Sequence, residues 1–483
     1  MQNINPRVVT GQAQIRPQTA ALDNPLYYLE NARTVINWVM AYHGDLLTDS
    51  EMARLEQLLA LPQPSQALLM RLVMRSSDLF RLRGLNYPEL GQPVAEALAP
   101  LVSDHWIDPD PKLTFEELCY LLRRSELAAA FAQALNNAGL KTNATKAVIE
   151  EALHTHLCGD ERTLAGWWQG CDDQAIRLCD EPLFERIRLM FFGNLRQSWS
   201  EFVITELGHQ RYEPVPLSPE SRAFNRRGDV DQYLAIHACR QRLDDAVTAE
   251  DCQVLRSRLP EDTGSNPWLS HRRARLLFDL GQKLERAGEL VLARDSYREA
   301  WTPDARVRYF RLLEKMAPAT EVWPLIERAE TEAETDSERQ RLGRIRQRVA
   351  KKAGIRARPK PPVNSLTVQT LELPSAPAVS VEQQVALTLA DQGGHCFYVE
   401  NTLFNSLFGL LFWPTIFAPL PGAFFHPFQA GPADLYREDF VGRRREQIED
   451  SLLTLEQGDY RQRILQHWQT RHGVANPFVH WPA

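Results

Sequence analysis

Apolar residues recur at intervals of three and four from Asn24 to about Leu157, which predicts amphipathic helices. Two of these segments open with residues that favour helix starts, namely NPLYYLENARTVINWVM and SEMARLEQLLAL. A helix that passes into a short polar turn is expected next, in PSQALLMRLVMRSSDLFRLRGLNY. This order fits a winged-helix-like module, although periodicity alone favours a helical bundle with solvated arginines over a DNA-binding module. The candidate phosphate contacts are Arg71, Arg75, Arg81 and Arg83.

Two short helices are expected between Ser125 and Leu153, on either side of NNAGLKTNATK. The small and polar residues of this connector suit a tight turn with exposed backbone N–H groups. Lys141 and Lys146 would then lie near a helix N-terminus, where a phosphate can bind. A helical hairpin without a ligand accounts for the same pattern equally well.

The clearest repeat-like unit is LLFDLGQKLERAGELVLARDSYREAWTPDAR, which alternates small and large residues. Its pattern resembles the tetratricopeptide repeat. One such unit cannot bury its own apolar face, so we expect residues 230–350 to form a short helical solenoid. Solenoid surfaces usually bind a protein partner or support neighbouring domains. The positions that carry the pattern are Leu280, Gly281, Gly288, Ala293, Tyr297, Ala300 and Pro303.

The most apolar segment is VENTLFNSLFGLLFWPTIFAPLPGAFF, which starts at Val399; no charge occurs between Glu400 and Asp434. A membrane span needs about 20 predominantly apolar residues. Polar residues and prolines interrupt this segment at Asn405, Ser406, Pro414 and Pro419. We therefore expect a buried helix and no membrane association.

The composition is ordinary for a soluble protein, with 44% hydrophobic and 24% charged residues. A length of 483 residues predicts about three domains or one helical array. The net charge of −7 argues against a uniformly basic coat for nucleic acid, yet permits local basic faces. One basic stretch, residues 339–360, holds no acidic residue and runs into the linker-like RPKPPVNS. This stretch modestly favours binding of a polyanion. The alternative is a helix end that is exposed to solvent.

The seven cysteines, without a signal-like N-terminus, predict reduced thiols. This usage fits a bacterial cytoplasm or a eukaryotic nucleus. A zinc site is not predicted, because neither a C-x-x-C pair nor a paired Cys and His spacing is present. The residues that could otherwise serve as its ligands are His154, His156, Cys158, Cys171 and Cys179.

Two segments near the C-terminus resemble the opening of the nuclease module of Fanconi-associated nucleases, the VRR-NUC family. They are SVEQQVALTLADQGGHCFYVENTLFNSLFGLLFWPTIF and PADLYREDFVGRRREQIEDSL. The earlier helices look like that family's winged-helix region, residues 125–153 like its SAP-type motif, and residues 270–315 like its tetratricopeptide part. The resemblance covers nearly the whole chain and implies a mainly α fold. The implied domains are winged-helix-like 1–120, SAP-like 121–229, tetratricopeptide-like 230–350, a basic and proline-rich linker 351–380, and the front of an α/β PD-(D/E)xK nuclease domain 381–483.

The resemblance implies a nuclease that uses Mg²⁺ or Mn²⁺ and cleaves DNA with a 5′ flap or another branch. It further implies 5′-to-3′ exonuclease action and a role in interstrand-crosslink repair, in association with the nucleoid of a bacterium. Glu382, in a first helical turn, and Glu400 are the implied metal ligands, although the helix dipole alone favours a glutamate there. Arg443 and Arg444 would face the scissile strand or lie in solvent.

The sequence departs from the family's pattern at its decisive motif. No lysine follows Lys360 and no Pro-Asp pair follows Glu382, so the PD…E-x-K half of the site is missing. We expect this chain alone to be inactive, with its apolar helix supporting strands that it does not contain. The alternative is a non-catalytic DNA-binding or scaffold protein, and a solenoid that binds only proteins comes third. That third function predicts no DNA affinity at moderate salt.

Overall fold

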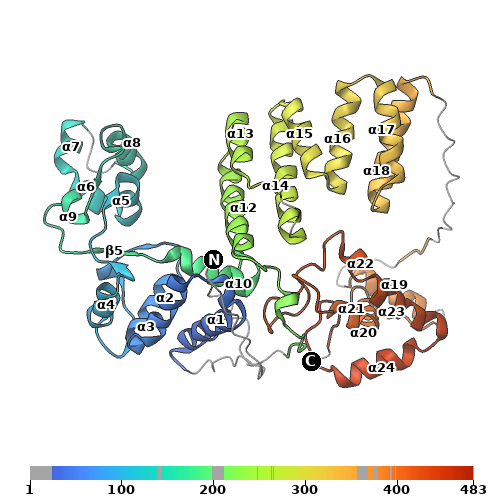
Figure 1. Ribbon diagram of the computed structural model, residues 1–483, viewed down its shortest axis with the longest axis horizontal. Coiled ribbons are helices and arrows are strands. Elements are labelled where there is room, and N and C mark those ends of the chain that lie inside the picture. The colour runs from blue at the N-terminus through green and yellow to red at the C-terminus, as the bar shows by residue number, and fades with distance from the viewer. Residues whose placement is uncertain are drawn as a thin grey trace, which may run out of the picture. The chain divides into compact units, whose positions relative to one another are not determined.

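The computed structural model describes residues 24–481 apart from 140–143, 198, 200–210, 247, 263, 265, 356–367, 369, 374–378, 392, 393 and 398. The chain divides into two units, one made of Met1–Gln210 with Phe425–Phe428, the other of Arg211–Phe424 with Gln429–Ala483. Helices dominate both units, as expected (Figure 1). Among the described residues, no helix is long and apolar enough to cross a membrane.

Helices and a small sheet make up the first part of unit 1. The helices are α1 (Tyr27–His43), α2 (Asp49–Ala60), α3 (Gln63–Val73) and α4 (Val94–Ser103), and α10 (Glu181–Phe192) returns to pack on α1. The antiparallel sheet has the order β1 (Leu79–Arg81), β5 (Ala175–Leu178), β2 (Ile107–Asp108). Thr48 starts α2 through a capping box with Glu51. The sequence predicts helices followed by a short polar turn here, and the structure places the strand β1 in that turn, which completes a winged-helix-like order.

A second helical group is inserted between β2 and β5, which pair with each other in the sheet. It consists of β3 (Leu113–Thr114), α5 (Phe115–Leu121), α6 (Arg124–Ala130), α7 (Ala132–Asn137), α8 (Lys146–Leu157), β4 (Glu161–Arg162) and α9 (Leu164–Trp167). Its core includes Phe115, Ile149 and Trp167 and extends to Leu79 of β1 and Ala175 of β5. The Trp167 indole donates a hydrogen bond to the Leu113 carbonyl at 2.8 Å. The pairing of β3 with β4 closes this insert at its base.

Stacked helices form the first part of unit 2 (Figure 1). They are α12 (Arg227–Asp245), α13 (Ala249–Arg258), α14 (Pro267–Arg286), α15 (Leu290–Ala300), α16 (Pro303–Met316), α17 (Ala319–Thr331) and α18 (Asp336–Lys352). Gly281 allows α14 and α15 to approach closely, because an added Cβ would lie 2.6 Å from a ring carbon of Tyr297. The buried Tyr297 hydroxyl donates to Glu285 at 2.8 Å. The small-and-large alternation in the sequence thus reflects helix packing.

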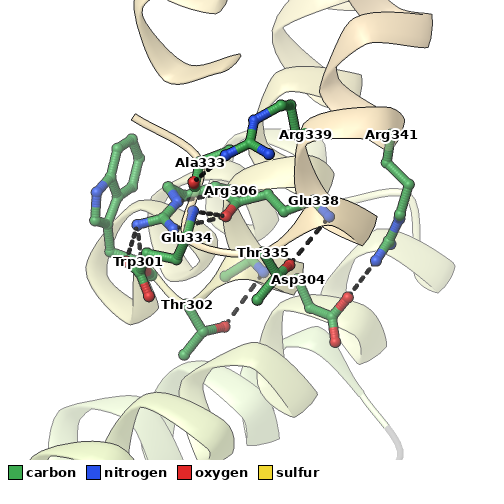
Figure 2. A network of polar contacts seen from close by, with 11 residues as sticks. Trp301, Thr302, Asp304, Arg306, Ala333, Glu334, Thr335, Glu338, Arg339 and Arg341 are labelled. Atoms are coloured by element: carbon green, nitrogen blue, oxygen red, sulfur yellow. Dashed lines mark hydrogen bonds and ion pairs between the residues drawn. The ribbon is translucent and has the colours of Figure 1, made fainter. Parts of the chain in front are cut away.

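A buried ion pair joins two of these stacked helices (Figure 2). The Arg306 guanidinium of α16 donates to both carboxylate oxygens of Glu338 in α18, at 2.6 and 2.9 Å. It also donates to Glu334 at 2.8 Å. Glu338 is 1% exposed, and its hydrogen bonds raise the pKa of Arg306 above the ordinary value. This pair keeps both charges satisfied inside the helical stack.

The C-terminal part of unit 2 is also helical, with α19 (Val381–Asp391), α20 (Leu403–Leu411), α21 (Trp413–Ile416), α22 (Phe440–Arg443), α23 (Arg445–Gln457) and α24 (Tyr460–Thr470). The apolar segment occupies α20 and α21. Leu410, Trp413 and Ile416 are buried, which confirms the expected core position for this end. Phe404, in the first turn of α20, is 72% exposed, so the expectation of a buried helix was wrong there. The start of the apolar run therefore lies at the surface, whereas its later part lies in the core.

Glu338→Gln is expected to lower the free energy of unfolding by about 2–4 kcal/mol, because it leaves the buried Arg306 charge with an incomplete partner. Urea denaturation followed by circular dichroism measures the loss. Asp304→Asn is the matched control, since the ion pair of Asp304 with Arg341 is exposed to water and worth less than about 1 kcal/mol. Equal losses in the two variants would contradict the difference in burial.

Candidate nucleic-acid interface

Arg71 and Arg81 are engaged by neighbouring side chains. Arg71, in α3, lies 3.9 Å above the ring of Tyr28 and donates to Glu89 at 2.9 Å. Arg81, in β1, forms ion pairs with Glu126 and Asp173, each at 2.7 Å, and its side chain is 18% exposed. These contacts give both arginines a role in joining elements of unit 1. A phosphate would have to displace buried or half-buried carboxylates to reach them.

Arg75 and Arg83, by contrast, are exposed. The Arg75 guanidinium lies 5.7 Å from the ring of Tyr87, and no ion pair holds it among the residues that the structure describes. Arg83 contacts Asp172 at 3.1 Å, but its side chain is 70% exposed. An ion pair this exposed contributes about 0–1 kcal/mol, so a phosphate can exchange for it. Arg75 and Arg83 are therefore the accessible cations of the predicted arginine set.

Lys146 is the first residue of α8, so it occupies the helix N-terminus that the sequence predicts. Its ammonium donates to the Cys119 carbonyl and lies 3.8 Å from Glu150. The side chain remains 36% exposed, which leaves part of it available to solvent. Lys141 lies outside the described residues.

Arg443 and Arg444 lie beside Asp434 instead of in solvent. Arg444 donates to both oxygens of Asp434, at 2.8 and 2.9 Å, and to the Thr415 carbonyl at 3.0 Å. Both Asp434 and Arg444 are 0% exposed. A fully buried guanidinium offers no surface to a phosphate, so a packing role replaces the expected DNA contact of Arg444. Arg443 also pairs with Asp434, and burial lowers its pKa from the ordinary value.

The two carboxylates proposed as metal ligands are exposed. Glu382 lies in the first turn of α19, where backbone N–H groups and the Ser380 hydroxyl hold its pKa below the ordinary value. Glu400 lies in the turn before α20. Among the described residues, neither belongs to a group of three possible metal ligands within mutual reach. Their carboxylates suit Mg²⁺ or Mn²⁺ chemically, but these residues do not form a complete site by themselves.

His154 and Cys158, for which the sequence did not predict a zinc site, lie together with a third donor, Glu116, that the sequence did not suggest. Glu116 of α5 and His154 of α8 lie 3.2 Å apart, measured from Oε1 to Nε2. Cys158 follows His154 by one helical turn, and the donor atoms of all three lie within 4.8 Å of one another. His154 and Cys158 do not match a zinc-finger spacing, but they are four residues apart and so share a helix face. The contribution of Glu116 depends on the packing of α5 and could not be read from spacing.

Family models match the two domains of unit 1. "FAN1, HTH domain" matches residues 26–108, and "Fanconi anemia-associated nuclease SAP domain" matches residues 112–167. The second range coincides with the insert between β2 and β5.

Relatives match nearly the whole chain. A Fanconi-associated nuclease 1 homolog of Pseudomonas aeruginosa is 41% identical over 97% of this chain and 83% of its own length. The Arabidopsis thaliana homolog is 23% identical over 98% of this chain and 58% of its own length. Among solved structures, "Crystal structure of paFAN1 bound to 2nt 5'flap DNA with gap" superposes with a TM-score of 0.81 at 41% identity, covering 96% of this chain and 83% of the other.

Proposed function

The chain belongs to the Fanconi-associated nuclease family, and we propose that it recognises branched DNA as part of a structure-specific nuclease. The observation that carries this proposal is the likeness in fold and sequence to a family member bound to 5′-flap DNA. That likeness extends over the helix-turn-helix and SAP domains and the helical stack. The proposed substrate is therefore DNA with a 5′ flap or a related branch.

The exposed cations of unit 1 fit contacts with the DNA backbone. Arg75 and Arg83 have side chains that water already reaches, so their pairing with phosphate costs little desolvation. Lys146 adds a positive charge at the N-terminus of α8, where backbone N–H groups also favour an anion. Such contacts hold the duplex in position without reading its sequence.

The proposed reaction is hydrolysis of phosphodiester bonds, as flap endonuclease and 5′-to-3′ exonuclease, in the repair of interstrand crosslinks. Mg²⁺ or Mn²⁺ would activate the attacking water and neutralise charge on the phosphate. Glu382 and Glu400 are the proposed ligands of this chain, and both are exposed. A DNA substrate would place the protein at the nucleoid of a bacterium or in a eukaryotic nucleus.

A non-catalytic DNA-binding or scaffold function is the second candidate. It is favoured by the two family-model matches, which cover residues 26–108 and 112–167 and include neither Glu382 nor Glu400. Under this function the chain binds flap DNA and does not cut it. The helices α12 to α18 would then serve as a surface for a protein partner.

Arg75→Ala and Arg83→Ala are each expected to weaken binding to 5′-flap DNA. Each should also lower the slope of log K against log salt by about 0.9, because one phosphate contact is lost. Fluorescence anisotropy over a range of salt concentrations measures both changes. Lys315→Ala, which removes an exposed cation from α16, is the control. Slopes that match wild type in both arginine variants would exclude these residues from the interface.

Glu382→Gln tests the proposed chemistry in this chain fused to a PD…E-x-K segment of another family member. The unmutated fusion should cut flap DNA with Mn²⁺ and stop cutting when EDTA is added. The variant should cut about 100-fold more slowly, because one carboxylate ligand is lost while DNA binding is kept. Single-turnover cleavage on denaturing gels measures the rate.

Glu372→Gln, which neutralises an exposed carboxylate before α19, controls for charge in the same fusion. Full activity in Glu382→Gln would contradict the ligand role of Glu382.

A further inference from the structure

The SAP domain carries the one group of three metal-ligand side chains that lie within mutual reach among the described residues. Glu116 comes from the first turn of α5, His154 from the last turn of α8, and Cys158 from the cap of α8. All three side chains are exposed. Two helices of one small domain therefore present a nitrogen, a sulfur and an oxygen donor at the same point of the surface.

The local structure of α8 fixes two of the donors. Its last turn closes with a hydrogen bond from the Cys158 N–H to the His154 carbonyl, at 2.9 Å. The two side chains therefore share one helix face, as pairs of metal ligands four residues apart do. His156, between them, points around the helix to another face, because residues two apart do not share one. The core formed by Phe115, Ile149 and Leu153 holds α5 against α8 and so sets the position of Glu116.

The distances suit a small tetrahedral ion. Zinc bonds of about 2.0–2.2 Å to nitrogen and oxygen place those two donors about 3.4 Å apart in a tetrahedron. Glu116 Oε1 and His154 Nε2 are already 3.2 Å apart. The Cys158 sulfur lies within 4.8 Å of both, so it must approach by at most about 1 Å for bonds of this length. An exposed side chain can make that adjustment by rotation about χ1.

We propose that Glu116, His154 and Cys158 bind a divalent cation of the zinc type, with water as the fourth ligand. One thiolate, one imidazole and one carboxylate suit Zn²⁺ better than Mg²⁺, which prefers oxygen donors alone. Cys158 binds as the thiolate and releases its proton to solvent. Because the site is exposed and keeps a water, the ion exchanges with the medium. When bound, it clamps the end of α8 to α5 and steadies the helix that begins at Lys146.

Cobalt titration of the full chain tests the site, since Co²⁺ replaces Zn²⁺ and reports its ligands by absorption. Binding of one Co²⁺ should give visible bands of tetrahedral geometry and an ultraviolet thiolate-to-cobalt band, both removed by added Zn²⁺. Cys158→Ser should abolish the thiolate band, and His154→Ala should weaken binding at least about 10-fold. Cys179→Ser and His156→Ala are matched controls, because these exposed residues lie outside the group and should leave the spectrum unchanged.

A second measurement uses only the wild-type chain, so misfolding of a variant cannot confuse it. Zn²⁺ should slow alkylation of Cys158 by iodoacetamide at least about 10-fold, as read by peptide mass spectrometry, and should leave Cys179 unaffected. Absence of the thiolate band, its survival in Cys158→Ser, or equal protection of the two cysteines would overturn the proposal.

Discussion

Pairing of arginines with the protein's own carboxylates is the interaction on which the structure most depends. Arg444 and Asp434 are fully buried, and Arg306 meets a Glu338 that is 1% exposed. A buried charge without a partner costs several kcal/mol, so each pair fixes the elements that carry it. Arg306 joins α16 to α18, and Arg444 joins the start of α23 to the carbonyl of Thr415 in α21. Arginine suits this role because its planar group binds both oxygens of a carboxylate.

The same pairing limits what the protein can offer to DNA. In a chain of net charge −7, many guanidinium groups are neutralised within the fold. Arg75 and Arg83 differ from Arg71 and Arg81 by their exposure, although all four belong to one short basic segment. Each of the exposed cations that contacts a phosphate would lower the affinity for DNA as salt rises, by a slope of about 0.9 per contact.

The sequence predicted the helical elements well, because capping residues and apolar periodicity act locally. The helix expected from SEMARLEQLLAL is α2, although its cap is Thr48 and not Ser50, and the Gly281 and Tyr297 pattern marks a close helical pair. Contacts between residues far apart in the sequence could not be predicted from the sequence. β1 pairs with β5 across the whole SAP insert, and no local signal showed that Arg444 is buried whereas Phe404 is exposed. Likewise, Glu116 joins His154 and Cys158 only through helix packing. The family resemblance supplied the expectation of DNA binding, which composition alone did not.

The most direct test of the account is the affinity of this chain for a 5′-flap DNA and for a matched plain duplex, measured by fluorescence anisotropy at two salt concentrations. The account predicts tighter binding to the flap, with an affinity that falls as salt rises. Equal affinity for both DNAs, or no binding at moderate salt, would contradict it and leave a helical protein that binds other proteins.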